Sequence, residues 1–144
     1  MTTVERVDFV SVPTRDTAQA RRFYGELLGL HESTTPEDVF PEFETSNVTL
    51  GVFKPEDVGM PFVPSAGVAV RVPDVEEARR ELEAAGVQFH GETVDTGVCH
   101  MAFCQDFDGN GLIIHRRYAE PRPDGMGHRE SREREDVRKA EATS

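Results

Sequence analysis

The sequence predicts an α+β domain of two tandem βαβββ modules, whose strands form a curved mixed sheet around a cleft with the helices on its outer face. Three observations predict it: a repeated pattern, a helix cap at the same place in each copy, and strand-like runs after each helix. The first copy reads VDFVSVPTRDTAQARRFYGELLGL (7–30), and the second reads GVAVRVPDVEEARRELEAAGV (67–87). In both copies a proline follows the strand and a glycine follows the helix, as expected at element boundaries.

Each copy contains a helix with a recognisable beginning. Asp16 followed by Gln19, and Asp74 followed by Glu77, have the spacing of a capping box. Apolar residues recur at helical spacing inside both segments and predict one buried stripe on each helix. The stripes consist of Ala20, Phe23 and Leu27 in the first helix and of Val75, Ala78, Leu82 and Ala85 in the second.

Alternating and β-branched runs follow the helices, at 42–53 and at 98–116. In the second run the turn residues DFDGN (106–110) predict a hairpin that sets Phe103 near Ile113 and Met101 near His115. We therefore expect one domain over 1–118, with modules at about 4–53 and 67–118 and a proline-rich linker at 54–66. Residues 119–144 are highly charged and are expected to form a flexible tail.

Composition limits the class of protein. A chain of 144 residues suits one compact core, and two cysteines do not make a disulfide framework. The sequence shows no export signal and no long apolar run, so a cytoplasmic protein is expected. The net charge of −11 argues against binding to nucleic acid or to an anionic membrane. It would favour a cationic ligand, although solubility is the simpler explanation.

These segments resemble the vicinal oxygen chelate superfamily, which includes glyoxalase I, extradiol dioxygenases, fosfomycin-resistance enzymes and bleomycin-resistance proteins. The resemblance rests on DFVSVP (8–13), RRFYGELLGL (21–30), GVAVRVPD (67–74) and DFDGNGLII (106–114). It implies the fold given above and a homodimer. It also implies a cluster of His, Gln or Glu side chains that holds a divalent cation with open positions for substrate oxygens.

The expected metal ligands are missing from this chain. The resemblance places three of the four ligand positions on Phe9, Val68 and Ile113, which have no donor atom that could bind a metal. The fourth position falls within VTLGV (48–52), which carries no carboxylate. No metal and no other cofactor are therefore predicted, and an apolar cleft is expected in place of the metal centre.

Alternation along the strands predicts which side chains face the cleft. His115 points to the same side as Ile113 and is the best candidate for an acid, a base or a hydrogen-bonding anchor, because imidazole can give or take a proton near neutral pH. His100 and Cys104 point to the opposite side. The predicted ligand-binding residues are Phe9, Ser11, Val68, Val70, Cys99, Met101, Phe103, Ile113 and His115.

The sequence favours a glyoxalase/bleomycin-resistance-like protein that binds a small, partly apolar molecule in the cleft without a metal. Two alternatives stay open. One is a metal-dependent lyase or dioxygenase of the glyoxalase type, with a rearranged site that includes His115 and Glu44. The other is a metal-free enzyme that uses His115 as acid or base, and a less favoured variant of it has Cys99 as the nucleophile.

Overall fold

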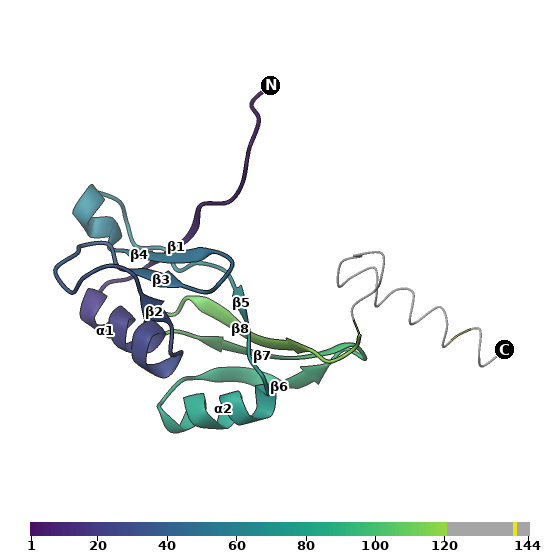
Figure 1. The fold of residues 1–144 in the computed structure, drawn as a ribbon. Coiled ribbons are helices and arrows are strands. Elements are labelled where there is room, and N and C mark those ends of the chain that lie inside the picture. The colour runs from purple at the N-terminus through teal and green to yellow at the C-terminus, as the bar shows by residue number, and fades with distance from the viewer. Residues whose placement is uncertain (121–139, 141–144) are drawn as a thin grey trace.

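The computed structural model describes residues 1–120 and 140, and two similar modules follow one another along the chain (Figure 1). Asp16 caps the first helix, because its side chain accepts a hydrogen bond from the backbone N–H of Gln19. Beyond the helix Gly29 has a φ of 69°, which glycine adopts without strain. The first module consists of β1 (Phe9–Pro13), α1 (Thr17–Arg21), the π-helix η1 (Arg22–Leu27), β2 (His31–Glu32), β3 (Glu42–Glu44) and β4 (Thr49–Phe53).

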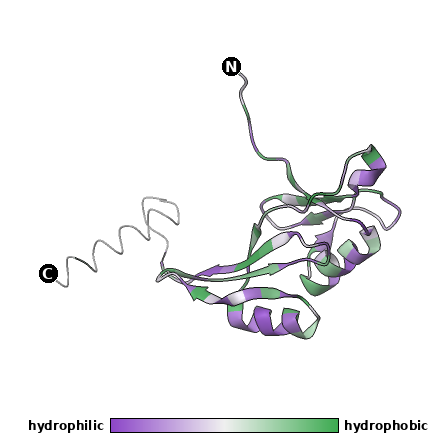
Figure 2. Cartoon of the chain, turned by 180° about the vertical axis from the view of Figure 1, so that it is seen from behind, coloured by the Kyte–Doolittle hydropathy of each residue, from purple (hydrophilic) through white to green (hydrophobic). Residues whose placement is uncertain are grey.

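The second module repeats this order. Asp74 accepts a hydrogen bond from the backbone N–H of Glu77, and Gly86 has a φ of 93° beyond the end of the helix. The helix is hydrophilic on its exposed side (Figure 2). The module consists of β5 (Val68–Arg71), α2 (Val75–Ala84), β6 (Phe89–Asp95), β7 (Cys99–Gln105) and β8 (Gly111–Arg117), and the predicted turn at 106–110 joins β7 to β8.

Each module forms a four-stranded mixed sheet. The strand order is β1-β4-β3-β2 in the first, called sheet A here, and β5-β8-β7-β6 in the second, called sheet B. In both sheets the first strand pairs in parallel with the last one, and the other neighbours are antiparallel. The predicted α+β class and the two βαβββ modules are therefore confirmed.

One hydrophobic core lies between the two sheets. Phe23 of the first helix and Leu82 of α2 belong to a single cluster of buried side chains that draws on both sheets. Sheet A supplies Val12, Phe43, Leu50 and Val52 to this cluster, and sheet B supplies Ala102, Cys104, Leu112 and Ile114. The helix-bearing faces of the two sheets thus look towards each other within the chain. Sharing one core buries apolar surface that a module of this size would leave in water.

The segment between the modules, predicted as a linker at 54–66, contains one short element, the 3₁₀-helix η2 (Pro55–Val58). It lies against the first module, where the guanidinium carbon of Arg15 is 3.7 Å from the centre of the Phe62 ring. The predicted charged tail falls outside the described residues except for Ala119, Glu120 and Ala140. Among the described residues, no helix has the length and apolar character needed to cross a membrane.

Candidate functional site

The face of sheet B that points away from the core, open face B, carries most of the predicted site. The register of β7 and β8 sets Phe103 opposite Ile113 and Met101 opposite His115, as the hairpin predicted. Side chains paired in this way point to the same side of a sheet. Phe103 keeps 37% of its surface exposed, although a side chain of this kind is usually buried. These four residues therefore form a continuous and largely apolar surface with His115 at one end.

Cys99 lies on the same side of β7 as Met101 and Phe103, but its side chain is not exposed to solvent. It pairs with Arg117, its exposed fraction is 0%, and its sulfur lies 3.0 Å from the hydroxyl oxygen of Thr96. This burial favours a structural role for Cys99. Cys104 is buried on the helix side, as predicted, where burial raises the pKa of its thiol to about 12 and the carboxylate of Asp106 adds to the effect. The Cys104 thiol therefore stays protonated and unreactive at neutral pH.

Phe9 and Ser11 lie on the outward side of sheet A, open face A, as expected from their alternation with the buried Val12. The parallel register of β1 and β4 places Gly51 beside Ser11. The Phe9 ring lies close to Gly51, because a Cβ built there would be in ordinary van der Waals contact with the ring at 3.5 Å. Phe9 itself is 58% exposed, so this face presents an aromatic ring to solvent from the edge strand β1.

Acidic side chains border open face A. Glu42 pairs with Gly51, and Glu44 pairs with Thr49, so both glutamates point to the side of Phe9. Glu44 accepts hydrogen bonds of 2.9 and 3.1 Å from the hydroxyl of Thr49. Open face A therefore combines an exposed aromatic ring with two carboxylates.

Val68 and Val70 do not lie on open face B, so the prediction that they face the same cleft as Ile113 and His115 is wrong. They pair in register with Leu112 and Ile114, and all four side chains belong to the shared core or pack against it. A shift of one residue turns every side chain of a strand to the opposite face, and the ligand position expected at Val68 is displaced by such a shift.

Open face B carries Gly67, Ala69 and Arg71 in their place. Gly67 precedes Asp74 by the same number of residues as Phe9 precedes Asp16. Aligning the two helix caps in the sequence would therefore have predicted this register. Ala69 pairs with Ile113, and Arg71 pairs with His115. A Cβ built on Gly67 would lie only 3.2 Å from Cδ1 of Ile113, so the isoleucine fills the space above the glycine.

Two cavities confirm that the core-bearing faces look towards each other. One, of about 490 Å³, lies between sheet A and the edge strand β5. Its lining includes Val10, Leu50, Val68 and Val70 from the core-bearing faces, and Ala69 and Arg71 from the other side of β5. The other, of about 280 Å³, lies between the first helix and α2. Open faces A and B must then point away from each other. The predicted cleft residues of the two modules are therefore not brought together within a single chain.

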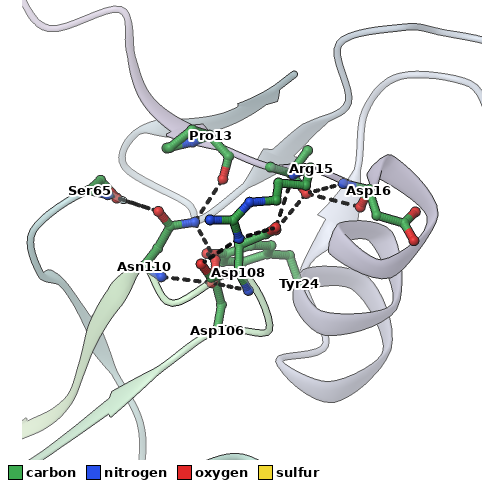
Figure 3. Close-up of polar contacts among 9 residues, drawn as sticks. Pro13, Arg15, Asp16, Tyr24, Ser65, Asp106, Asp108 and Asn110 are labelled. Atoms are coloured by element: carbon green, nitrogen blue, oxygen red, sulfur yellow. Dashed lines mark hydrogen bonds and ion pairs between the residues drawn. The ribbon is translucent and has the colours of Figure 1, made fainter. Parts of the chain in front are cut away.

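A buried network of polar side chains ties the two modules together (Figure 3). The carboxylate of Asp106 accepts four hydrogen bonds, from the Tyr24 hydroxyl at 2.6 Å, the Asn110 side-chain amide at 2.8 Å, and the backbone N–H groups of Asp108 and Asn110 at 2.9 Å each. Burial raises the pKa of the Tyr24 phenol far above its ordinary value, with Asp106 as the next cause, so the phenol remains a donor.

The same turn also holds the end of β1. Asp108 accepts hydrogen bonds from the Thr14 hydroxyl at 2.6 Å and from the backbone N–H of Arg15 at 2.9 Å. The side-chain amide of Asn110 donates to the carbonyl oxygen of Pro13 at 2.7 Å. The sequence predicts these residues as a turn, but no local pattern indicates that they bridge the modules. Their buried, fully occupied carboxylates indicate a structural role.

The donor atoms that the fold brings together do not form a metal site in the described part of the chain. Phe9 and Ile113 have no ligand atoms, and Gly67 has no side chain. Glu44 and His115 belong to open faces that point away from each other. Within residues 1–120, no group of three or more His, Cys, Asp or Glu side chains is placed so that it could hold a metal ion.

Comparisons with known proteins agree with this architecture. The family model described as Glyoxalase/Bleomycin resistance protein/Dioxygenase superfamily matches residues 6–114. No curated protein sequence gives a match. Among solved structures, the antibiotic binding protein TnmS3 from Streptomyces sp. CB03234 is 23% identical, with 81% of this chain and 99% of that chain covered and a TM-score of 0.66.

Two further solved structures have the same fold. Lactoylglutathione lyase from Agrobacterium tumefaciens is 15% identical, with 78% of this chain and 94% of that chain covered and a TM-score of 0.66. A glyoxalase/bleomycin resistance protein/dioxygenase from Nocardioides is 18% identical, with 88% and 93% covered and a TM-score of 0.66. At this level of identity the likeness concerns the fold alone.

Proposed function

The chain belongs to the Glyoxalase/Bleomycin resistance protein/Dioxygenase superfamily, and from this premise we propose that it binds a small, partly apolar molecule on its open faces without a metal ion. The observation that carries the proposal is the exposure of aromatic side chains on both faces. Phe9 is 58% exposed and Phe103 is 37% exposed, and each lies on a rigid strand. Exposed apolar patches on folded proteins commonly mark binding sites.

The residues at the family's ligand positions support binding without a metal. Phe9, Gly67 and Ile113 replace the His, Gln and Glu donors that a divalent cation would need, so the group does not fit. The proposed binding therefore involves no metal ion. The antibiotic-binding relative shares the fold, and a binding role of that general kind suits an apolar face better than catalysis does.

We place the complete site between two copies of the chain. Each open face lies alone on the outside of the chain, and a twofold homodimer can bring face A of one copy beside face B of the other at two equivalent places. Both aromatic patches would then line one enclosed cleft.

A complementation experiment tests the shared site. The neutral fluorescent probe N-phenyl-1-naphthylamine should bind the wild-type protein, and Phe9→Asp and Phe103→Asp should each weaken that binding by more than about tenfold, because a charge in an apolar site must be desolvated. Co-refolding the two variants should restore one good site per mixed dimer, since one pair of faces is then unaltered. Failure to recover probe fluorescence, with a monomer seen by sedimentation, would contradict a site between copies.

A second experiment tests the absence of a metal. Protein purified without a tag or chelator should contain far less than one equivalent of metal, and Zn²⁺, Ni²⁺, Mn²⁺ and Fe²⁺ should leave its Tm unchanged, because a ligand stabilises only a state that binds it. One equivalent of metal and a rise in Tm that disappears in His115→Ala would overturn the proposal and support a lyase or dioxygenase. His90→Ala is the matched control for loss of a histidine.

A further inference from the structure

Open face B has a chemical polarity along β8. Its aromatic end carries Phe103 and Ile113, which face each other across β7 and β8. Towards the other end, His115 pairs with Arg71 of β5 on one side and with Met101 on the other. Arg117 lies two residues beyond His115 and so points to the same side. The basic side chains of Arg71, His115 and Arg117 therefore lie next to the apolar surface on the same face.

The two arginines have capacity for further hydrogen bonds. Arg71 is exposed at the edge of sheet B. The Nη1 atom of Arg117 is buried and has no hydrogen-bond partner, while its Nη2 donates to the carbonyl oxygen of Glu120 at 3.3 Å. A buried guanidinium N–H without an acceptor is costly, and an anionic oxygen is the strongest acceptor that could satisfy it.

This local charge is opposite to that of the whole chain. The protein carries a net charge of −11, which by itself would favour a cationic ligand. Arg71, His115 and Arg117 nevertheless occur together on the face where the apolar site is proposed. A binding site responds to the charges that line it more than to the distant net charge, because solvent and salt screen the latter.

We propose that open face B binds a partly apolar anion, whose ring system lies on Phe103 and Ile113 and whose carboxylate or similar group meets Arg71, His115 and Arg117. This inference rests on the proposed function and names the chemical class of its ligand. Two residues along a strand span roughly 7 Å, so Ile113 and His115 are separated by about the length of a fused two-ring acid. Guanidinium groups bind such carboxylates with two parallel hydrogen bonds.

Three compounds of the same shape test the charge preference: naphthalene-2-carboxylate, naphthalene-2-carboxamide and naphthalene-2-carboxamidine. Titration calorimetry should show the carboxylate binding roughly tenfold more tightly than the carboxamide, and the cationic carboxamidine most weakly. The preference should decline as salt is added, because the basic groups are partly exposed.

Substitutions assign the preference to this face. Arg71→Gln should reduce the carboxylate-to-carboxamide ratio several-fold, because it removes a charge from the proposed site but little apolar surface. Arg80→Gln, on the exposed side of α2, removes the same charge elsewhere and should leave the ratio intact. A ratio equally sensitive to both variants would overturn the local assignment.

The results separate this inference from the proposed function. Equal binding of the carboxylate and the carboxamide, or tighter binding of the carboxamidine, would overturn the anion preference. If NMR signals of Met101 and His115 still shifted with the neutral compound, small-molecule binding on this face would stand. If none of the three compounds bound, both the anion preference and small-molecule binding on this face would be overturned for ligands of this size.

Discussion

Asp106→Ala should destabilise the protein by about 4 kcal/mol, because it leaves several buried hydrogen-bond donors without an acceptor. The lost carboxylate serves the Tyr24 hydroxyl, the Asn110 side chain and two backbone N–H groups. These donors come from both modules, so the substitution also weakens the attachment of the first helix to the β7–β8 turn. Urea unfolding should show the loss, and Tm should fall by roughly 10 °C or more.

Asp57→Ala is the matched control for this substitution. Asp57 is an exposed residue of η2, and removing its carboxylate should change stability by less than about 0.5 kcal/mol. A loss below about 1 kcal/mol in Asp106→Ala would contradict the view that this network ties the modules together.

Phe23→Ala should cost about 3–5 kcal/mol and should destabilise both modules at once, because it opens a cavity in their shared core. The ring is 1% exposed, and it packs edge-on against Tyr24 at 5.0 Å and against Phe107 of the second module at 5.2 Å between ring centroids. Native-state hydrogen exchange should therefore lose protection at Leu50 in sheet A and at Ile114 in sheet B by the same free energy.

Phe40→Ala removes the same ring from a loop position that is 48% exposed and should change stability by less than about 1 kcal/mol. Unfolding of Phe23→Ala in two separate transitions, with only sheet A weakened, would show that the modules fold independently. The shared core would then be only a contact between two stable units.

The periodic parts of the fold were accessible from the sequence because local interactions set them. Asp16 and Asp74 cap the two helices where the capping-box spacing placed them. The turn DFDGN fixed the register of β7 and β8, and with it the pairing of Met101 with His115. The exposed positions of Phe9 and Ser11 followed from simple alternation.

The register of β5 was accessible only by counting back from the helix cap at Asp74, which reaches Gly67. The strand VAVR itself does not reveal the register, because its valines at alternate positions are compatible with either side, and its pairing with β8 shows which side faces the core. Val68 and Val70 pair with Leu112 and Ile114 and therefore face the core. Arg71, which is next to Val70, consequently points to the open face.

The two modules, their helix caps, the closing hairpin and the lack of metal donors at Phe9 and Ile113 follow from residue type and local spacing. The shared core of the helix-bearing faces and the outward direction of the open faces depend instead on tertiary contacts. Contacts between residues far apart in the chain decide that arrangement. They include Tyr24 with Asp106 and Phe23 with Phe107, which no local pattern encodes.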